Sequence, residues 1–351
     1  MHKIRDLFFA VLVSFPVVGP LHAAGSFDVY LGITKAGMEE HPMYGYFKNG
    51  IWHEYKRTPG SEAVNASDFH VEGGKFYALG SQKHKSNDYR YGYWIDQAWH
   101  ALTAPPGYKV VRVNKITTIA GDIYITGAIS KIQYQHIPGY WKNGAWHNVE
   151  APYPNFSVTD MFIDQGKMTL TGSHYDEAKN QSIFHFRKDG KWQDVELKPN
   201  MKPMVKLLSK MHRGDLYQVG EVRLLEKPME RLPAYWKNGV MQWYGTQLTV
   251  VTCMLVDGDD VYIGGWDNEF HPGYWKKGQW VALPFSGHRG VSGVNSMYKA
   301  GDTLFVGGQN PGPDSTTTYP GYWANNEWTL LKHPQNNDNI DVLYIGAEKR
   351  P

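Results

Sequence analysis

Cysteine is almost absent from this sequence, which has one such residue, Cys253, in a chain of 351. A single cysteine cannot form a disulfide within the chain, and it rules out a paired-cysteine zinc motif. The sequence also contains no Gly-x-Ser-x-Gly nucleophile elbow and no glycine-rich phosphate loop of the known types. We therefore expect neither a metal nor a cofactor.

A charge excess and long apolar runs are missing as well. The 36 Lys and Arg residues nearly balance the 34 Asp and Glu residues, which argues against a nucleic-acid-binding surface. An apolar run from Leu7 to Val18 follows Lys3 and Arg5 and is too short to cross a bilayer, so it predicts a signal peptide over residues 1–25. We expect an exported monomer, secreted or periplasmic, without a membrane span.

Aromatic residues, at 14%, and 37 glycines are abundant, and many of them belong to one repeated motif. Its clearest copy runs from Gly139 through Tyr140 and Trp141 to Trp146. Seven copies begin at Gly45, Gly92, Gly139, His185, Ala234, Gly273 and Gly321, at steps of 47, 47, 46, 49, 39 and 48 residues. Repeats of this length are typical of propellers and solenoids.

One repeat contains the pattern of four short strands. Val251 to Val256 predicts the first strand, and a turn at Asp257-Gly258-Asp259 leads to a second at Val261 to Gly265. Gly273 to Trp275 and Gln279 to Leu283 predict the third and fourth strands. A four-stranded unit of this kind is the blade of a propeller.

The two ends of the chain complement each other. Phe27 to Gly32 resembles a second strand with no first strand before it, and Ile340 to Ile345 resembles a first strand with nothing after it. Pairing the two closes the ring and protects its edge strands. The sequence thus predicts an all-β, seven-bladed β-propeller that forms a single domain over residues 26–351.

The repeat resembles the kelch family of β-propellers. The resemblance is carried by Tyr262-Ile263-Gly264-Gly265, Tyr274 and Trp280 to Pro284, and again by Phe305-Val306-Gly307-Gly308, Tyr322 and Trp328. The resemblance implies the propeller fold, and it implies a binding platform more often than an enzyme, because most kelch propellers bind and a minority catalyse.

Twelve of the 13 tryptophans belong to the repeated hairpins. A residue required once in each blade is expected to pack between blades, although repeated aromatic rings also suit a multivalent glycan binder. Trp266 lies outside the pattern in a predicted loop and is the better candidate for a ligand contact. The loops between second and third strands vary widely and share one face, where we expect any binding site.

The first strands line the channel of a propeller, and aligning them gives two columns of polar residues. One column includes Asn114 and Asn295, which are candidate ligand-binding residues. The next places Asp68, Lys115 and Asp160 in three successive blades, where they could bind a sugar or a cation, or act as acid and base. Small polar side chains around a wet channel also need no further role.

These features predict a non-enzymatic binding module that recognises a glycan or a protein through its loop-rich face. The alternative is a carbohydrate-active enzyme, namely a hydrolase, lyase or sugar isomerase, with a polar site at the channel mouth. An enzyme is expected to gather several charged side chains at one end of the channel.

Overall fold

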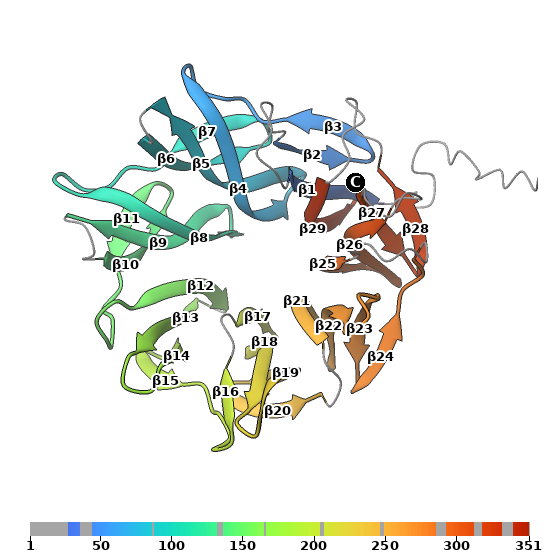
Figure 1. Ribbon diagram of the computed structural model, residues 1–351. Coiled ribbons are helices and arrows are strands. Elements are labelled where there is room, and N and C mark those ends of the chain that lie inside the picture. The colour runs from blue at the N-terminus through green and yellow to red at the C-terminus, as the bar shows by residue number, and fades with distance from the viewer. Residues whose placement is uncertain are drawn as a thin grey trace, which may run out of the picture.

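The structure is a computed structural model that describes residues 27–35, 44–85, 88–131, 136–164, 166–203, 207–245, 249–285, 293–311, 318–331 and 340–350. The predicted signal peptide, 1–25, lies outside the described residues. Seven antiparallel sheets are arranged around a common axis (Figure 1). The predicted all-β, seven-bladed propeller is therefore confirmed. The described part of the chain has no helix that is long and apolar enough to cross a membrane.

Each blade runs from an inner strand at the axis to an outer strand. Blade 1 contains β4 (Ser61–Glu72), β5 (Lys75–His84), β6 (Asp88–Ile95) and β7 (Ala98–Ala101). Blade 2 contains β8 (Lys109–Ile119), β9 (Asp122–Ser130), β10 (His136–Lys142) and β11 (Ala145–Asn148). Blade 3 contains β12 (Ser157–Asp164), β13 (Lys167–Asp176), β14 (Gln181–Lys188) and β15 (Lys191–Asp194).

The next three blades follow the same plan. Blade 4 contains β16 (Met201–Pro203) and β17 (Leu208–His212), which both pair with β18 (Asp215–Leu224), then β19 (Lys227–Lys237) and β20 (Val240–Tyr244). Blade 5 contains β21 (Thr249–Asp257), β22 (Asp260–Asp267), β23 (Pro272–Lys276) and β24 (Gln279–Ala282). Blade 6 contains β25 (Gly293–Ala300), β26 (Thr303–Pro311), β27 (Thr318–Ala324) and β28 (Glu327–Leu330).

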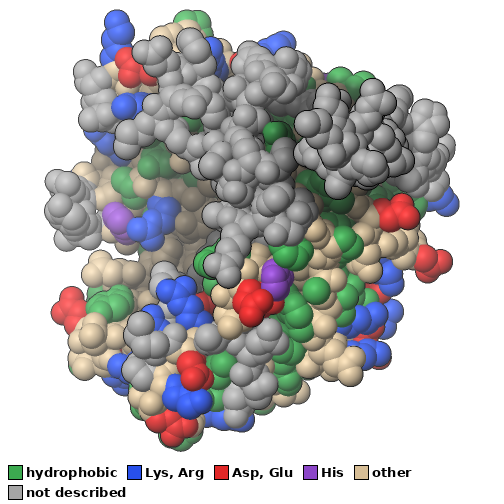
Figure 2. Space-filling model, turned by 45° about the vertical axis from the view of Figure 1, so that its right-hand side comes forward, with side chains coloured by type: hydrophobic (Ala, Val, Ile, Leu, Met, Phe, Trp, Pro, Cys, Tyr) green, Lys and Arg blue, Asp and Glu red, His purple; other side chains and the backbone are tan. Residues whose placement is uncertain are grey.

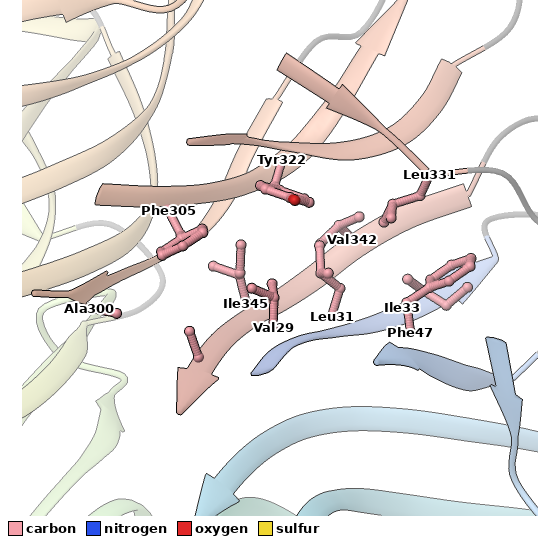
Figure 3. Packing of buried hydrophobic residues seen from close by; sticks show 11 residues of the cluster. Val29, Leu31, Ile33, Phe47, Ala300, Phe305, Tyr322, Leu331, Val342 and Ile345 are labelled. Atoms are coloured by element: carbon pink, nitrogen blue, oxygen red, sulfur yellow. The ribbon is translucent and has the colours of Figure 1, made fainter. Parts of the chain in front are cut away.

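Blade 7 joins the two ends of the chain. Its inner strand β29 (Ile340–Lys349) pairs antiparallel with β1 (Phe27–Lys35), which is followed by β2 (Gly45–Lys48) and β3 (Ile51–Glu54). Val29 and Leu31 of β1 pack with Val342 and Ile345 of β29 in a buried cluster that includes Phe305 of blade 6 (Figure 3). This packing closes the ring as the sequence predicts.

The motif tryptophans hold neighbouring segments together. Trp94, Trp141, Trp236 and Trp323 are fully buried. The Nε1 atom of each donates a hydrogen bond of 2.7 to 3.0 Å to a carbonyl oxygen in the connection that precedes its blade. A buried indole N–H needs such a partner, so the packing interpretation is correct for these four side chains.

The motif glycine is required by close packing within the hairpin. A Cβ atom on Gly139 would lie 2.2 Å from the carbonyl oxygen of His147 and 2.5 Å from the ring of Trp146. Asn143 and Gly144, with φ of 49° and 83°, form the turn between β10 and β11. Both residues need the left-handed conformation that Asn-Gly turns favour. The motif thus specifies turn geometry and close packing.

A β-bulge interrupts the inner strand of most blades at an equivalent place. The register shifts leave Ser67, Asn114, Thr159, Thr252 and Asn295 as the extra residues in their strands. In blade 7 the extra residue is Leu343. A bulge turns the side chain of the extra residue away from the regular alternation.

Candidate functional site

The three charged residues predicted on the inner strands form one group, which we call the axial group: Asp68, Lys115 and Asp160. Lys115 Nζ on β8 lies 3.0 Å from Asp68 Oδ1 on β4. The other Asp68 oxygen accepts a hydrogen bond of 2.8 Å from the backbone N–H of Ile116. Asp68 therefore connects blades 1 and 2.

Asp160 is 8% exposed, and its Oδ1 accepts a hydrogen bond of 2.8 Å from the N–H of Met161. Burial lowers the pKa of Lys115, but the charges of Asp68 and Asp160 outweigh it, so this pKa lies above its usual value. Lys115 stays charged between two carboxylates that are both engaged with backbone N–H groups. These contacts suit a structural network better than an acid and base.

Lys210 on β17 is a second inner-strand lysine that the sequence analysis missed, because it lies two residues beyond Leu208, the blade 4 equivalent of Lys115. Burial lowers the pKa of Lys210, and so does the charge of Lys115. The mutual repulsion indicates that the two ammonium groups face the same axial space.

The two candidate asparagines occupy equivalent bulges but make different contacts. Asn114 Nδ2 donates a hydrogen bond of 2.6 Å to the carbonyl oxygen of Val158 in the next blade. Thr252 makes the equivalent bond to Val294 in blade 6. Asn295 makes no side-chain hydrogen bond with the described residues. Asn114 is thus occupied in joining blades, whereas Asn295 is available to a ligand.

Blade 3 carries a hydrogen-bonded chain of side chains that the sequence analysis missed. The Nδ1 atom of His185 on β14 lies 2.8 Å from Asp194 Oδ1 on β15. The Nε2 atom of His185 lies 2.8 Å from Nδ1 of His174 on β13. The ring of Tyr153, in the connection from blade 2, stacks on His174 with centroids 4.1 Å apart.

The contacts of this chain determine where its protons lie. Burial lowers the pKa of His185, although the charge of Asp194 acts in the opposite direction, so His185 is neutral near pH 7. Its Nδ1–H then donates to Asp194, and its bare Nε2 accepts from Nδ1–H of His174. In this tautomer the Nε2 atom of His174 does not take part in the hydrogen-bonded chain, and the ring lies beside the half-exposed Tyr153.

The local packing explains why blade 3 can hold this chain. His185 occupies the motif position that is glycine in five repeats, where the second tryptophan of those hairpins crosses the glycine. The corresponding Trp192 instead packs edge-on against Phe156 at 4.7 Å and donates to the carbonyl oxygen of Glu150. This departure from the repeat is the sequence signal that could have identified the site.

A cation of blade 2 reaches the inner strand of blade 3. The exposed Arg112 on β8 places Nη1 3.3 Å from the hydroxyl of Ser157. Ser157 pairs directly with Ser173, which precedes His174 on β13, so the side chains of Ser173 and His174 project to opposite faces of the sheet. We call Arg112, Tyr153, His174, His185 and Asp194 the blade 3 cluster.

The surface near the ring opening also carries basic and histidine side chains. Burial lowers the pKa of His136 on β10, and so does electrostatic repulsion from the charge of Arg112. In the view of Figure 2, a histidine and Lys or Arg side chains lie together beside a recess at the left of the molecule. Among the described residues, no group of three or more His, Cys, Asp or Glu side chains could hold a metal ion.

Comparison with known proteins finds shared folds. No protein-family model matches the chain, and no curated protein sequence is similar to it. The polysaccharide lyase Uly1 is similar in structure, with a TM-score of 0.50 and 13% identity over 90% of this chain and 88% of the lyase. A puromycin-hydrolyzing peptidase of Mycobacterium tuberculosis has a TM-score of 0.52 and 11% identity over 80% of this chain. This chain spans about half of the peptidase, 48% of its length.

The predicted non-enzymatic binding module is wrong by this comparison. The two structures named above are enzymes, and one of them is a polysaccharide lyase, which counts against a non-enzymatic binder and leaves the alternative, a carbohydrate-active enzyme, to be argued. An identity of 11 to 13% shows the fold alone. The activity therefore has to be argued from the blade 3 cluster.

Proposed function

We propose that the protein is a carbohydrate-active enzyme, a lyase that cleaves a polysaccharide containing uronic acid at the blade 3 cluster. The observation that carries the proposal is the hydrogen-bonded order Asp194, His185, His174, which leaves His174 Nε2 outside the chain and the His174 ring beside a tyrosine. Cleavage by β-elimination needs such a base, an acid and a cation for the uronate carboxylate.

Each of these roles has a candidate in the cluster. Arg112 pairs with the uronate carboxylate and stabilises the negative charge that develops when the proton on C5 is removed. His174 Nε2 takes that proton, and Asp194 stabilises the positive charge that the histidine pair gains. The C4–O4 bond then breaks as the C4=C5 double bond forms, and the Tyr153 hydroxyl donates a proton to O4. Solvent afterwards restores Tyr153 and His174.

Hydrolysis is less well supported than elimination. Most glycoside hydrolases use two carboxyl groups that flank the scissile bond. The one carboxylate of the blade 3 cluster, Asp194, is bound to His185. Asp68 and Asp160 of the axial group accept backbone hydrogen bonds, and Asp68 also pairs with Lys115. Neither axial carboxylate is free to act as an acid or base.

Two further predictions belong to this proposal. Export through the signal peptide 1–25, to the periplasm or the medium, suits an enzyme whose substrate is a polymer outside the cytoplasm. The kelch-like repeat supplies a rigid scaffold whose variable connections carry Tyr153 and other candidate contacts. A glycan is the ligand class that this proposal requires.

The nature of the product tests the proposal. The mature protein is incubated with alginate, polygalacturonate and a glucuronate-containing polysaccharide, and the products are analysed by mass spectrometry and ultraviolet absorbance. We expect products with an unsaturated, absorbing end from at least one polymer. Products lighter than the corresponding hydrolysis product by one water support elimination, whereas saturated products with no such absorbance would overturn the lyase assignment in favour of a hydrolase.

A further inference from the structure

A second group of side chains meets between blades 5 and 6, away from the blade 3 cluster. Trp266 belongs to β22, Gly293 and Asn295 belong to β25, and Gln309 belongs to β26. Gly293 has no side chain, and a Cβ atom placed on it would lie 3.5 Å from the Trp266 ring and 3.8 Å from Asn295 Oδ1. The indole and the amide therefore border the same small space above Gly293.

Gln309 adds a third side to this space. It pairs directly with Gly293 in the sheet, and directly paired residues project their side chains to the same face. Gln309 is 8% exposed, and its Oε1 atom has no hydrogen-bond partner among the described residues. A buried carbonyl oxygen without a partner is costly, so this atom is expected to accept a hydrogen bond from a ligand or solvent.

The strand registers place this group at the same level of the propeller as the blade 3 cluster. Gly293 pairs with Gln309 as Arg112 pairs with Ala128 and as Ser157 pairs with Ser173. Trp266 lies in the equivalent row of blade 5, opposite Val250. The two groups are therefore at corresponding heights along the ring axis, near the ends at which the inner strands begin.

We propose that Trp266, Asn295 and Gln309 form a sugar-binding subsite for a pyranose unit. The indole offers a flat apolar surface for the C–H face of a sugar ring, and the two amides offer donors and acceptors for its hydroxyls. None of these groups carries a charge, so the subsite would bind the hydroxyls of a sugar. The carboxylate of the substrate would instead be bound by Arg112. This inference rests on the proposed function, because it supplies a second contact for the same polysaccharide chain.

Calorimetric titration of the full mature protein tests the subsite. The probes are hexasaccharides of galacturonate, alginate, xylan and cellulose, and His174→Ala is used as the background so that binding is measured without cleavage. We expect Trp266→Ala to weaken binding of the preferred hexasaccharide about tenfold, or about 1.4 kcal/mol. Asn295→Ala and Gln309→Ala are expected to weaken it in the same direction, and Ile51→Ala, which removes an exposed apolar side chain from blade 7, should leave it unchanged.

The outcomes separate this inference from the proposed function. Binding that depends on Trp266 supports the subsite, even where the unmodified protein cleaves none of the polymers and the lyase proposal fails. Equal affinity in Trp266→Ala and its background overturns the subsite, and so does failure of the background protein to bind any hexasaccharide. If Trp266→Ala does not fold, Trp266→Phe with Asn295→Ala answers the same question, because a smaller ring keeps the packing but reduces stacking.

Discussion

The Nδ1 atom of His174 lies 2.8 Å from the Nε2 atom of His185, and His185 stands where five repeats have glycine. One substitution in a structural motif thus gives blade 3 an ordered pair of imidazoles. Asp194 binds His185 at one end of the pair, which leaves Nε2 of His174 at the other end as the proposed proton acceptor. The catalytic proposal depends on this relationship.

Arg112 is expected to determine binding of the acidic substrate. Arg112→Ala should lower kcat/KM for a polyuronate about 100-fold or more, because it removes a charged partner of the carboxylate. Arg112→Lys should restore only part of the activity, because an ammonium cannot form the paired hydrogen bonds of a guanidinium. Steady-state kinetics measure both effects. Arg187→Ala, which changes an arginine on β14 of blade 3, is the control, and equal losses in both variants would contradict the assignment.

Asp194 is expected to act through His185. Asp194→Asn should lower the pKa of His185 further, since the carboxylate raises it through its charge and its hydrogen bond. The activity should fall because the histidine pair loses the partner that fixes its tautomer. The folded state should lose little stability, because the Asp194 side chain is 67% exposed. NMR titration of the imidazole follows the pKa, and an unshifted titration would show that the two side chains do not interact in solution.

The buried His185 should make stability depend on pH. Its pKa is lower in the folded protein than the usual 6.5, so the unfolded chain binds a proton at a higher pH than the folded protein does. The free energy of unfolding should therefore fall as the pH drops through about 6.5 toward the lower folded value. Thermal unfolding at a series of pH values should show a smaller acid loss in His185→Gln than in the unmodified protein. If stability falls equally with pH in both proteins, the acid sensitivity belongs to other groups. His70 is one such group, because burial lowers its pKa as well.

Asp68 is expected to contribute to stability and not to catalysis. Asp68→Ala removes the acceptor of the Ile116 N–H and the partner of Lys115, which should cost about 1–3 kcal/mol. Chemical denaturation measures this loss, and the kcat of the folded variant should stay close to that of the unmodified protein. A variant that keeps its stability but loses activity would move the active site to the axial group.

Much of the fold could be predicted from the sequence because its packing is repeated. A tryptophan that bonds to the preceding connection, and a glycine that lies under a second tryptophan, are needed in successive blades, so they recur at regular intervals. The ring closure was predictable for the same reason, since β29 and β1 each resemble one part of a repeat. Aligning equivalent strands also placed Asp68 and Lys115 in neighbouring blades, but it did not predict the ion pair that joins them.

The blade 3 cluster was harder to predict because it depends on register across three strands. His174, His185 and Asp194 are separated by 11 and 9 residues, and their contact requires the exact strand pairing. Arg112 lies 45 residues from Ser157 and meets it only because neighbouring inner strands converge. The sequence does show that His185 replaces a glycine. It does not show that Trp192 packs against Phe156.

The most direct test of the account compares two single variants of the same type. His174→Ala removes the proposed base, and His147→Ala removes an exposed histidine that stacks on Tyr140 in blade 2. The initial rate of unsaturated product formation from the preferred polyuronate is measured for both folded variants. The account predicts that His174→Ala lowers kcat about 10²–10⁴-fold while His147→Ala retains it. Retention of kcat in His174→Ala would contradict the central claim that blade 3 carries the catalytic base.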